Sequence, residues 1–270
     1  MSDWTTLKYT TPIDNVGIIE IARPDALNAI NSTVIAELDA LLASLVDAGL
    51  HALVLTGGGR AFVAGADISQ MANLTALEAA DFARLGQRAL NRLEHFPAPT
   101  IAAVNGFALG GGCELAMCCD LILAAANTRD DRGRIRGGAV FGQPEVALGV
   151  IPGFGGTQRL LRRVGRQRAL ELMMTGRKVD AEQAVEMGLA LQVVEGDVVE
   201  AALALAKKIQ RNSPAAVRLV KRAVHDTDRL DIDAGLAAEA ALFGLCFATE
   251  DQKEGMAAFL EKRAAAFAGR

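Results

Sequence analysis

The chain has 270 residues, of which 51% are apolar and 22% charged, with a formal net charge of −4. This length fits one large domain or one domain with an appendage. The mildly acidic balance disfavours a nucleic-acid binder, which usually carries a basic patch. No apolar run approaches the roughly 18 residues that a membrane-spanning helix needs. We therefore expect neither nucleic acid nor a membrane as a partner.

The ends and the cysteines bear on compartment and metal content. The stretch MSDWTTLKYTTPID lacks the basic and then apolar regions of a secretory signal. The three histidines are far apart, and none lies in an HExxH motif. The four cysteines show no zinc-ligand spacing and are expected to be buried, reduced thiols: Cys113, Cys118, Cys119 and Cys246. These features predict a cytoplasmic protein without a metal site.

Strands and helices alternate through the first half of the chain. Apolar residues recur at helical spacing over residues 31–48, with Asn31 or Ser32 as the N-cap. The other elements predicted here, in chain order, are strands at 16–22 and 52–56, a helix at 77–93, a strand at 101–104, a helix at 112–119 and a strand at 121–124. This alternation predicts an α/β core.

The second half of the chain is mostly helical. The elements predicted here are short helices at 157–164, 166–174 and 181–187, a strand at 191–194, and longer helices at 198–211, 214–227, 232–247 and 251–267. We divide the chain into an α/β core, residues 1–195, and a C-terminal helical region, residues 196–270. Whether that region packs on another subunit stays open. The stretch 129–138, RDDRGRIRGG, predicts an exposed, mobile loop.

Several catalytic motifs are missing from the sequence. It contains no GxSxG, which disfavours a serine-hydrolase elbow. It also contains neither GxxxxGK[ST] nor a strict GxGxxG, so a standard phosphate-binding loop or dinucleotide turn is not expected.

Three glycine-rich segments remain as candidate binding loops. Residues 57–67 and 105–114 each follow a predicted strand, and residues 151–156 precede a predicted helix. Glycine lets the backbone approach a ligand closely, and the free N–H groups at a helix start favour negative charge. One N–H donor from each of two loops would form an oxyanion hole. For any single segment, tight turns and close packing are the simpler explanation.

Two glutamates lie in apolar, glycine-rich surroundings. Glu114 is predicted just inside a helix, and Glu145 precedes the apolar run VALGVI. A carboxylate in such a setting is costly unless it has partners, although Glu114 could simply stabilise the helix N-terminus. If the two lie close together, one would be charged and the other protonated, as in an acid/base pair.

The segments AFVAGADI (61–68), NGFALGGGCEL (105–115) and FGQPE (141–145) resemble those of the enoyl-CoA hydratase (crotonase) superfamily, and the similarity runs from about residue 16 to residue 263. The resemblance implies an α/β fold, a crotonase-like spiral of β-β-α units with two near-perpendicular sheets. It also implies that the C-terminal helices serve trimerisation. Members of the family are commonly homotrimers or homohexamers, the latter built as dimers of trimers.

The resemblance also implies roles for individual residues. The backbone N–H groups of Ala66 and Gly111 would form the oxyanion hole for the thioester carbonyl. Glu114 would activate or orient the attacking water, Glu145 would transfer the proton at C2, and Gly153 would lie near the water. The other substrate-binding residues implied are Ala64, Gly65, Asp67 and Ile68, the last two at the adenine end of CoA, and the C-terminal Phe259 and Lys262, which can reach a neighbour's CoA.

The activity implied is hydration of a trans-2-enoyl-CoA to a 3-hydroxyacyl-CoA, in fatty-acid or related acyl-CoA breakdown. No cofactor is implied, because CoA belongs to the substrate. An enoyl-CoA isomerase or another crotonase reaction is the alternative, although isomerases commonly use one carboxylate and both Glu114 and Glu145 are present. A more remote alternative is an RNA-binding protein of this fold, which would use a lysine-rich surface helix. The basic residues at 207–208 and 221–222 form only isolated pairs, which disfavours this alternative.

The sequence departs from the family pattern at one place. Glu114 and Glu145 are 31 residues apart, which is longer than the family's usual spacing. The excess falls in the arginine-rich stretch 128–138. We interpret it as a surface insertion; the alternative is that Arg132, Arg134 or Arg136 contacts CoA phosphates or a neighbouring subunit. The walls of the acyl pocket are expected from the variable stretch 70–85.

Overall fold

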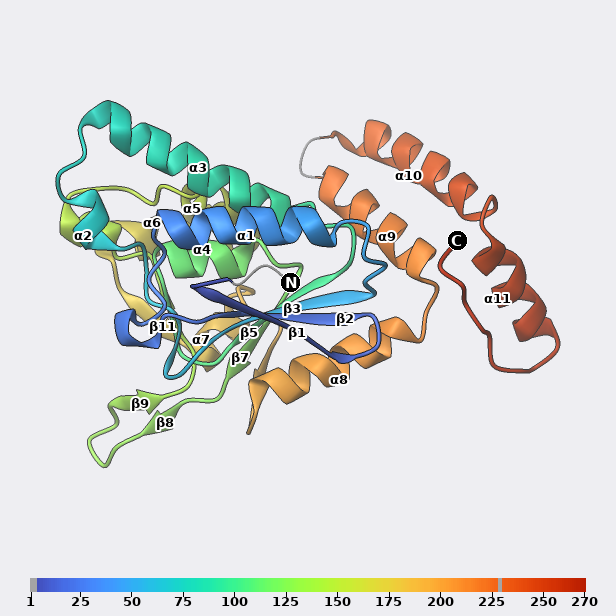
Figure 1. Ribbon diagram of the computed structural model, residues 1–270, viewed down its shortest axis with the longest axis horizontal. Helices are drawn as coiled ribbons and strands as arrows, with labels where there is room; N and C mark the ends of the chain where they lie inside the picture. Colours follow the sequence, from blue (N-terminus) through green and yellow to red (C-terminus); the bar gives the residue numbers. More distant parts are fainter. Residues whose placement is uncertain (1–3, 228–229) are drawn as a thin grey trace.

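A six-stranded sheet forms the centre of the molecule, which a computed structural model describes for residues 4–227 and 230–270 (Figure 1). Its strands lie in the order β1-β2-β3-β5-β7-β12, and only the β1–β2 pair is antiparallel. The bounds are β1 Leu7–Ile13, β2 Val16–Ile21, β3 Ala52–Gly57, β5 Thr100–Val104, β7 Leu121–Ala125 and β12 Gln192–Val194.

A second, four-stranded sheet has the order β11-β10-β6-β4. Its strands are β4 Ala61–Val63, β6 Phe107–Leu109, β10 Val140–Gly142 and β11 Lys178–Asp180. Strands β4, β6 and β10 run parallel, and β11 runs antiparallel to β10. The carboxyl ends of β4, β6 and β10 therefore meet at one edge of this sheet.

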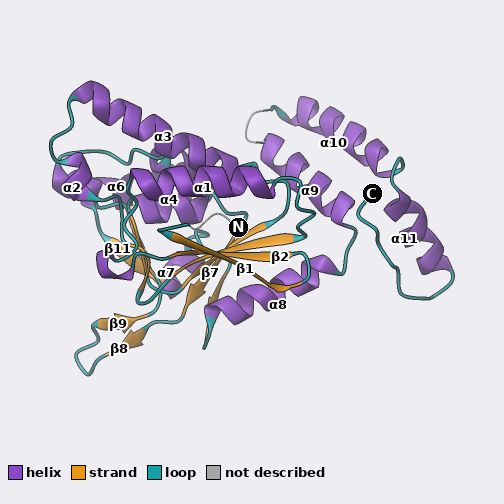
Figure 2. Ribbon diagram, viewed as in Figure 1, coloured by secondary structure: helices purple, strands orange, loops and turns teal. Residues whose placement is uncertain are grey.

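Helices cover both faces of the large sheet (Figure 2). On one face, helix α1 (Ser32–Leu45) presents six buried apolar residues to the core, and the Asn31 side chain caps it by accepting the N–H of Val34 at 2.9 Å. Helix α3 (Ala76–Glu94) packs beside α1 and begins with a capping box. On the opposite face, helix α8 (Val198–Gln210) buries its apolar side against β3, β5 and β7.

The other helices of the core are short. Helix α4 (Gly111–Met117) is buried along its whole length because it lies between the sheets and the other helices. The other short elements are η1 Pro24–Ala26, α2 Ile68–Met71, η2 Glu145–Leu148, α5 Gly156–Val164, α6 Arg166–Thr175 and α7 Ala181–Glu186.

The last three helices are α9 Pro214–Thr227, α10 Ile232–Cys246 and α11 Glu250–Leu260. Helix α9 lies against the core, whereas α10 and α11 extend away from the sheets (Figure 1). No single helix within the described ranges is long and apolar enough to cross a membrane, and only the bent pair α10 and α11 meets that test together, by length and composition.

The structure confirms the predicted α/β core with two sheets and a helical C-terminal region, but it corrects several details. The stretch 129–138 is exposed, yet it forms a hairpin of β8 (Thr128–Arg129) and β9 (Ile135–Gly137) rather than an irregular loop. The last helix ends at Leu260 instead of residue 267, because Lys262 takes a φ of 56° and the chain folds back.

The returning C-terminal chain is tied to the start of α11. The N–H of Glu250 bonds the Arg270 carbonyl at 2.8 Å, and the Asp251 carboxylate accepts the N–H of Ala268 at 2.8 Å. The cysteines are free thiols as expected, but Cys246 is half-buried rather than buried. Residues 1–3, at the start of the stretch predicted to lack a targeting signal, lie outside the described residues.

Three arginines of the hairpin form ion pairs. Arg134 and Arg136 both bind the Asp130 carboxylate within the hairpin, at 2.9 and 2.8 Å, and Arg129 binds Asp180 at the start of α7. Because these carboxylates offset the arginines, the net positive charge of this surface is smaller than the arginine count suggests.

Candidate active site

Three loops meet at the edge where the parallel strands β4, β6 and β10 end. The residues after these strands are 64–67, 110–114 and 143–145. The register aligns Phe107 of β6 with Val140 of β10 and with Ala61 of β4, so the three exits lie side by side. Ligands commonly bind beyond the carboxyl ends of parallel strands, and the glycine-rich segments and the second glutamate all converge here.

Glu114 is buried within α4 and has fixed partners. Its carboxylate Oε1 accepts the backbone N–H of Phe154 at 2.8 Å and that of Gly156 at 2.6 Å. Glycine is required at position 112, because a Cβ there would lie 1.9 Å from the Val63 carbonyl oxygen. Burial raises the pKa of Glu114 to about 7, although the two N–H donors act to lower it. The carboxyl group therefore titrates near neutral pH.

Glu145 begins the 3-10 helix η2 and is half-buried. A Cβ at Gly110 would lie 2.6 Å from Glu145 Oε1, which places this carboxylate against the turn into α4. Turned to face it, the Gln143 amide nitrogen donates to both oxygens, at 3.0 and 3.1 Å. Burial raises the pKa of Glu145, and its charge in turn raises the pKa of Glu114. The two glutamates thus interact as a pair.

Ala66 and Gly111 lie next to each other beside this pair. A Cβ at Gly111 would be 3.5 Å from the Ala66 nitrogen. The loop of Ala66 is held by Ile30, whose N–H bonds the Gly65 carbonyl and whose carbonyl accepts the N–H of Asp67, both at 2.8 Å. Gly111 is the first residue of α4, where the backbone N–H has no acceptor inside the helix. One N–H from each loop is therefore placed on the same side of the site.

The remaining residues of the first loop extend outward from the site. The N–H of Ala64 bonds the Leu27 carbonyl at 3.0 Å. Hydrogen bonding from Ser69 is the main cause that lowers the pKa of Asp67, which also pairs with Arg23 at 3.2 Å. Ile68, at the start of α2, is more than half exposed. This part of the loop is open to a ligand that extends from the site to the surface.

Gly153 directly precedes Phe154, whose N–H binds Glu114. Its carbonyl accepts the Gln87 amide of α3 at 2.8 Å, and a Cβ at this position would come within 3.8 Å of Ala83. The next residue, Phe154, packs its ring on Phe82 with centroids 5.4 Å apart. Helix α3 therefore contacts the loop that carries the two N–H donors of Glu114. The same helix contains residues 76–85, the larger part of the stretch expected to line the acyl pocket.

Phe259 and Lys262 do not join the site of their own chain. They lie at the end of α11, on the opposite side of the molecule from α2 and α4 (Figure 1). The Phe259 side chain is 83% exposed.

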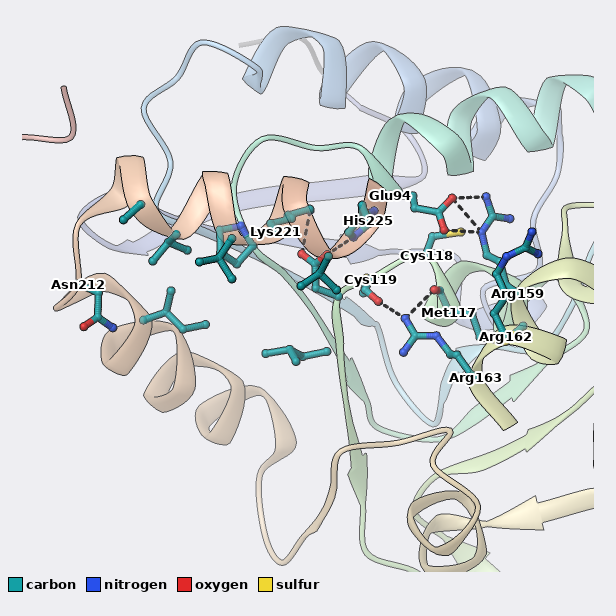
Figure 3. A pocket seen from close by; sticks show the side chains of 18 residues that line it. Glu94, Met117, Cys118, Cys119, Arg159, Arg162, Arg163, Asn212, Lys221 and His225 are labelled. Carbon is teal, nitrogen blue, oxygen red and sulfur yellow. Dashed lines mark hydrogen bonds and ion pairs between the residues drawn. The ribbon is translucent and has the colours of Figure 1, made fainter. Parts of the chain in front are cut away.

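A cavity of about 850 Å³ lies elsewhere, between the C-terminal end of α4 and helices α8 and α9 (Figure 3). Its polar lining includes Asp120, which bonds Lys221 at 2.8 Å and His225 at 2.9 Å. Neither glutamate of the pair lines this cavity, so it is a separate feature from the site built on α4 and η2.

The chain is similar to proteins of a known family. A family model described as enoyl-CoA hydratase/isomerase matches residues 13–270. The chain belongs to the enoyl-CoA hydratase/isomerase family. A short-chain-enoyl-CoA hydratase of Clostridium acetobutylicum is 47% identical over 92% of this chain and 92% of its own length. A crotonyl-CoA hydratase of Syntrophomonas wolfei is 47% identical over 94% of this chain and 95% of its own.

Solved structures agree with that family assignment. The crystal structure of an enoyl-CoA hydratase from Bacillus anthracis superposes with a TM-score of 0.91 at 35% identity, covering 98% of this chain and 100% of that one. The crotonase resemblance and fold expected from the sequence motifs are thereby confirmed.

Some groups at this family site were not singled out from the sequence. They are the Gln143 amide and the N–H groups of Phe154 and Gly156, all of which bind one of the two glutamates. A glutamine directly after the apolar stretch of β10 and two positions before Glu145 is the signal that could have identified Gln143, which is buried. The N–H groups of Phe154 and Gly156 are backbone donors that almost any residue type could supply, so their contact with Glu114 becomes visible only in the folded structure.

Proposed function

We propose that this chain is an enoyl-CoA hydratase, a carbon–oxygen lyase that adds water across the C2=C3 bond of a trans-2-enoyl-CoA to give a 3-hydroxyacyl-CoA. The observation that carries the proposal is the pair Glu114 and Glu145. Burial raises the pKa of both, and both lie beside the N–H groups of Ala66 and Gly111. The hydratases named above, 47% identical over nearly their whole length, support it.

In the proposed reaction, the thioester carbonyl oxygen sits between the N–H groups of Ala66 and Gly111. Attack of water on C3 moves the π electrons toward C2 and the carbonyl, so negative charge develops on this oxygen. Two fixed N–H donors stabilise that charge where it forms. They belong to two loops that the parallel strands bring together, so the stabilisation depends on the fold and not on one segment.

The two glutamates divide the proton transfers. We assign Glu114 the role of the base, because its two backbone N–H donors favour the ionised form. It orients the water and accepts one of its protons as the C3–O bond forms. Glu145, whose pKa burial raises toward the protonated form, donates a proton to C2. One water is consumed, and the cycle closes when the proton taken by Glu114 returns to Glu145, directly or by way of solvent.

The other contacts follow the path of the substrate. We assign Ala64, Gly65, Asp67 and Ile68 to the CoA portion and Gly153 to the vicinity of the water. We propose that no cofactor takes part, because the carboxylate pair and the two N–H donors supply every proton and charge contact that this addition needs. The compartment we propose is the cytoplasm, where the three buried thiols stay reduced.

We also propose that the chain assembles as a homotrimer or as a homohexamer. The apolar side chains exposed on α10 and α11 support this assembly, since single chains rarely leave large apolar patches uncovered. In such an assembly Phe259 and Lys262 would approach the CoA bound by a neighbouring copy.

The experiment that tests the function offers the purified protein crotonyl-CoA and a 3-enoyl-CoA in separate reactions. A hydratase removes the conjugated enoyl-thioester absorbance of crotonyl-CoA and yields 3-hydroxybutyryl-CoA. An isomerase instead creates that absorbance from the 3-enoyl-CoA and leaves crotonyl-CoA unhydrated. Gain of absorbance without any hydroxyacyl product would contradict the proposal and favour the isomerase alternative.

A further inference from the structure

Arg159, in α5, has a side chain that the proposed chemistry does not use but that the fold holds fixed. It is only 10% exposed, and its guanidinium donates to the Glu94 carboxylate of α3 at 2.7 to 3.1 Å. It also donates to Asn91 Oδ1 at 2.6 Å and to the Phe154 carbonyl at 2.8 Å. All three nitrogens of the guanidinium are therefore bound.

The Phe154 contact ties this arginine to the catalytic pair. Arg159 holds the carbonyl of Phe154, whose N–H donates to Glu114, and the following Gly156 supplies the second donor. Between them Gly155 has a φ of 110°, a conformation that glycine adopts readily. A Cβ at Gly155 would lie 2.1 Å from Arg159 Nη1, so the guanidinium occupies the space beside this turn.

We propose that Arg159, anchored by Glu94, is a positioning residue that keeps the 154–156 loop in the geometry where both N–H groups bind the Glu114 carboxylate. The proposal rests on the role in hydration proposed above for Glu114. Without this anchor, the loop loses the bond that fixes the Phe154 peptide, and the carboxylate that orients the water loses its fixed direction. A misplacement of about 1 Å is enough to reduce turnover substantially.

The charges around the loop make the proposal testable by pH. The titratable and charged groups that face Glu114 are Glu145 of η2, Arg159 of α5 and the thiols of Cys113 and Cys118 on its own helix. The positive charge of Arg159 lowers the pKa of Glu114, against the effect of burial.

The anchoring carboxylate is ionised. Burial alone would raise the pKa of Glu94, but the hydrogen bond and charge of Arg159 hold it below its usual range, and His95 and His225 also face it. Removing the positive charge of Arg159 raises the pKa of Glu114. Glu94→Gln leaves that charge in place and removes only its anchor, so this variant tests the position of Arg159 separately from its charge.

The chain offers a matched control on the same helix. Arg163 is also half-buried and also binds backbone carbonyls, but its hydrogen bonds go to Met117 and Cys119 at the end of α4 rather than to the 154–156 loop (Figure 3). Arg163→Met therefore removes a comparable side chain and comparable carbonyl contacts from α5 without touching the partners of Glu114.

The test measures kcat, KM for crotonyl-CoA and the pH profile of kcat/KM for four variants. Arg159→Met is expected to lower kcat about 10- to 100-fold with little change in KM, and to move the acidic limb upward by about 1 pH unit. Arg159→Lys keeps the charge, so the limb returns to its wild-type position and part of kcat is restored. Glu94→Gln is expected to lower kcat in the same direction as Arg159→Met, because the guanidinium loses its anchor, whereas Arg163→Met leaves both kcat and the limb unchanged.

Wild type and Glu114→Gln are measured first, which separates this proposal from the proposed function. If wild type does not hydrate crotonyl-CoA, or Glu114→Gln keeps its rate, the proposed function fails and this proposal with it. If those two behave as expected but Arg159→Met matches Arg163→Met in kcat and in pH profile, only the role of Arg159 is overturned. If Arg159→Met does not fold, Glu94→Gln decides: a kcat equal to that of Arg163→Met overturns the proposal.

Discussion

The edge of the small sheet and the C-terminal helices differ in how complete they are within one chain. At the edge, buried polar groups have partners from the same chain, as Glu114 does in Phe154 and Gly156. On α10 and α11, apolar side chains stand in solvent: Ile232 is 74% exposed and Phe243 65%. The paired polar groups at the edge therefore all come from one chain, whereas the C-terminal helices leave exposed the apolar surface on which the proposed assembly rests.

The largest effect is expected where the edge carries its chemistry. Glu145→Gln keeps the size and the contact with Gln143 but removes the proton donor, so turnover of crotonyl-CoA should fall by about 10²- to 10⁴-fold with the fold intact. Steady-state kinetics and a thermal melt measure the two properties together. Glu182→Gln, on the exposed face of α7, serves as the control. A rate near that of the control would remove Glu145 from the mechanism.

The same edge can be tested at its backbone. Gly111→Pro removes one oxyanion donor while keeping a residue that suits the first turn of a helix, and turnover should drop by about 10²- to 10³-fold. Gly111→Ala is the matched control, because it keeps the N–H and adds a Cβ about 3.3 Å from the Phe154 ring. Equal losses in both variants would show that crowding, and not the donor, limits the rate.

The pH dependence of kcat/KM tests whether Glu114 and Glu145 act as a coupled pair. Burial raises the pKa of Glu114 from 4.5 to about 7, so this base keeps its proton up to a higher pH than a free glutamate. Activity should therefore fall about tenfold per unit as the pH drops below that range. The raised pKa of Glu145 extends its protonated form to a higher pH than that of a free glutamate, and loss of this proton predicts a second fall on the alkaline side. A kcat/KM profile that stays flat down to about pH 5 would contradict these assignments.

The smallest effect is expected in the C-terminal helices. Phe259→Ala should leave kcat unchanged and raise the KM for crotonyl-CoA by a few fold, because the side chain would contact CoA only across a subunit boundary. Met174→Ala, at an exposed apolar residue near the end of α6, controls for general loss of apolar surface. Size-exclusion chromatography run beside the kinetics shows whether the assembly itself has changed; a large drop in kcat with the assembly unchanged would contradict the assignment.

The sequence predicted the longer elements well because their patterns extend over several turns. The helix at α1 and its Asn31 cap follow from apolar spacing and a capping residue. Strands β4, β6 and β10 have only three residues each, too few to display a period of two, so they were not predicted. Their parallel register is what brings the three loops together, and the geometry of the site could not be predicted without it.

The missed contacts follow the same logic. Glu114 and Glu145 were found because charged residues are unusual in apolar, glycine-rich surroundings. The donors of Phe154 and Gly156 are backbone groups, and the Arg159 contacts with Glu94 and Asn91 join residues 65 and 68 positions apart. The end of α11 was misplaced because the turn there uses Lys262 at positive φ rather than glycine, and lysine gives no signal for such a turn.

We propose that Glu114 and Glu145 act together as the acid/base pair of a hydratase. The most direct measurement is the loss of enoyl-thioester absorbance from crotonyl-CoA for wild type, Glu114→Gln, Glu145→Gln and the double variant. We expect fast loss with wild type and, because the pair works as a unit, a double variant hardly slower than either single one. Fast wild-type hydration that both single variants retain would contradict it.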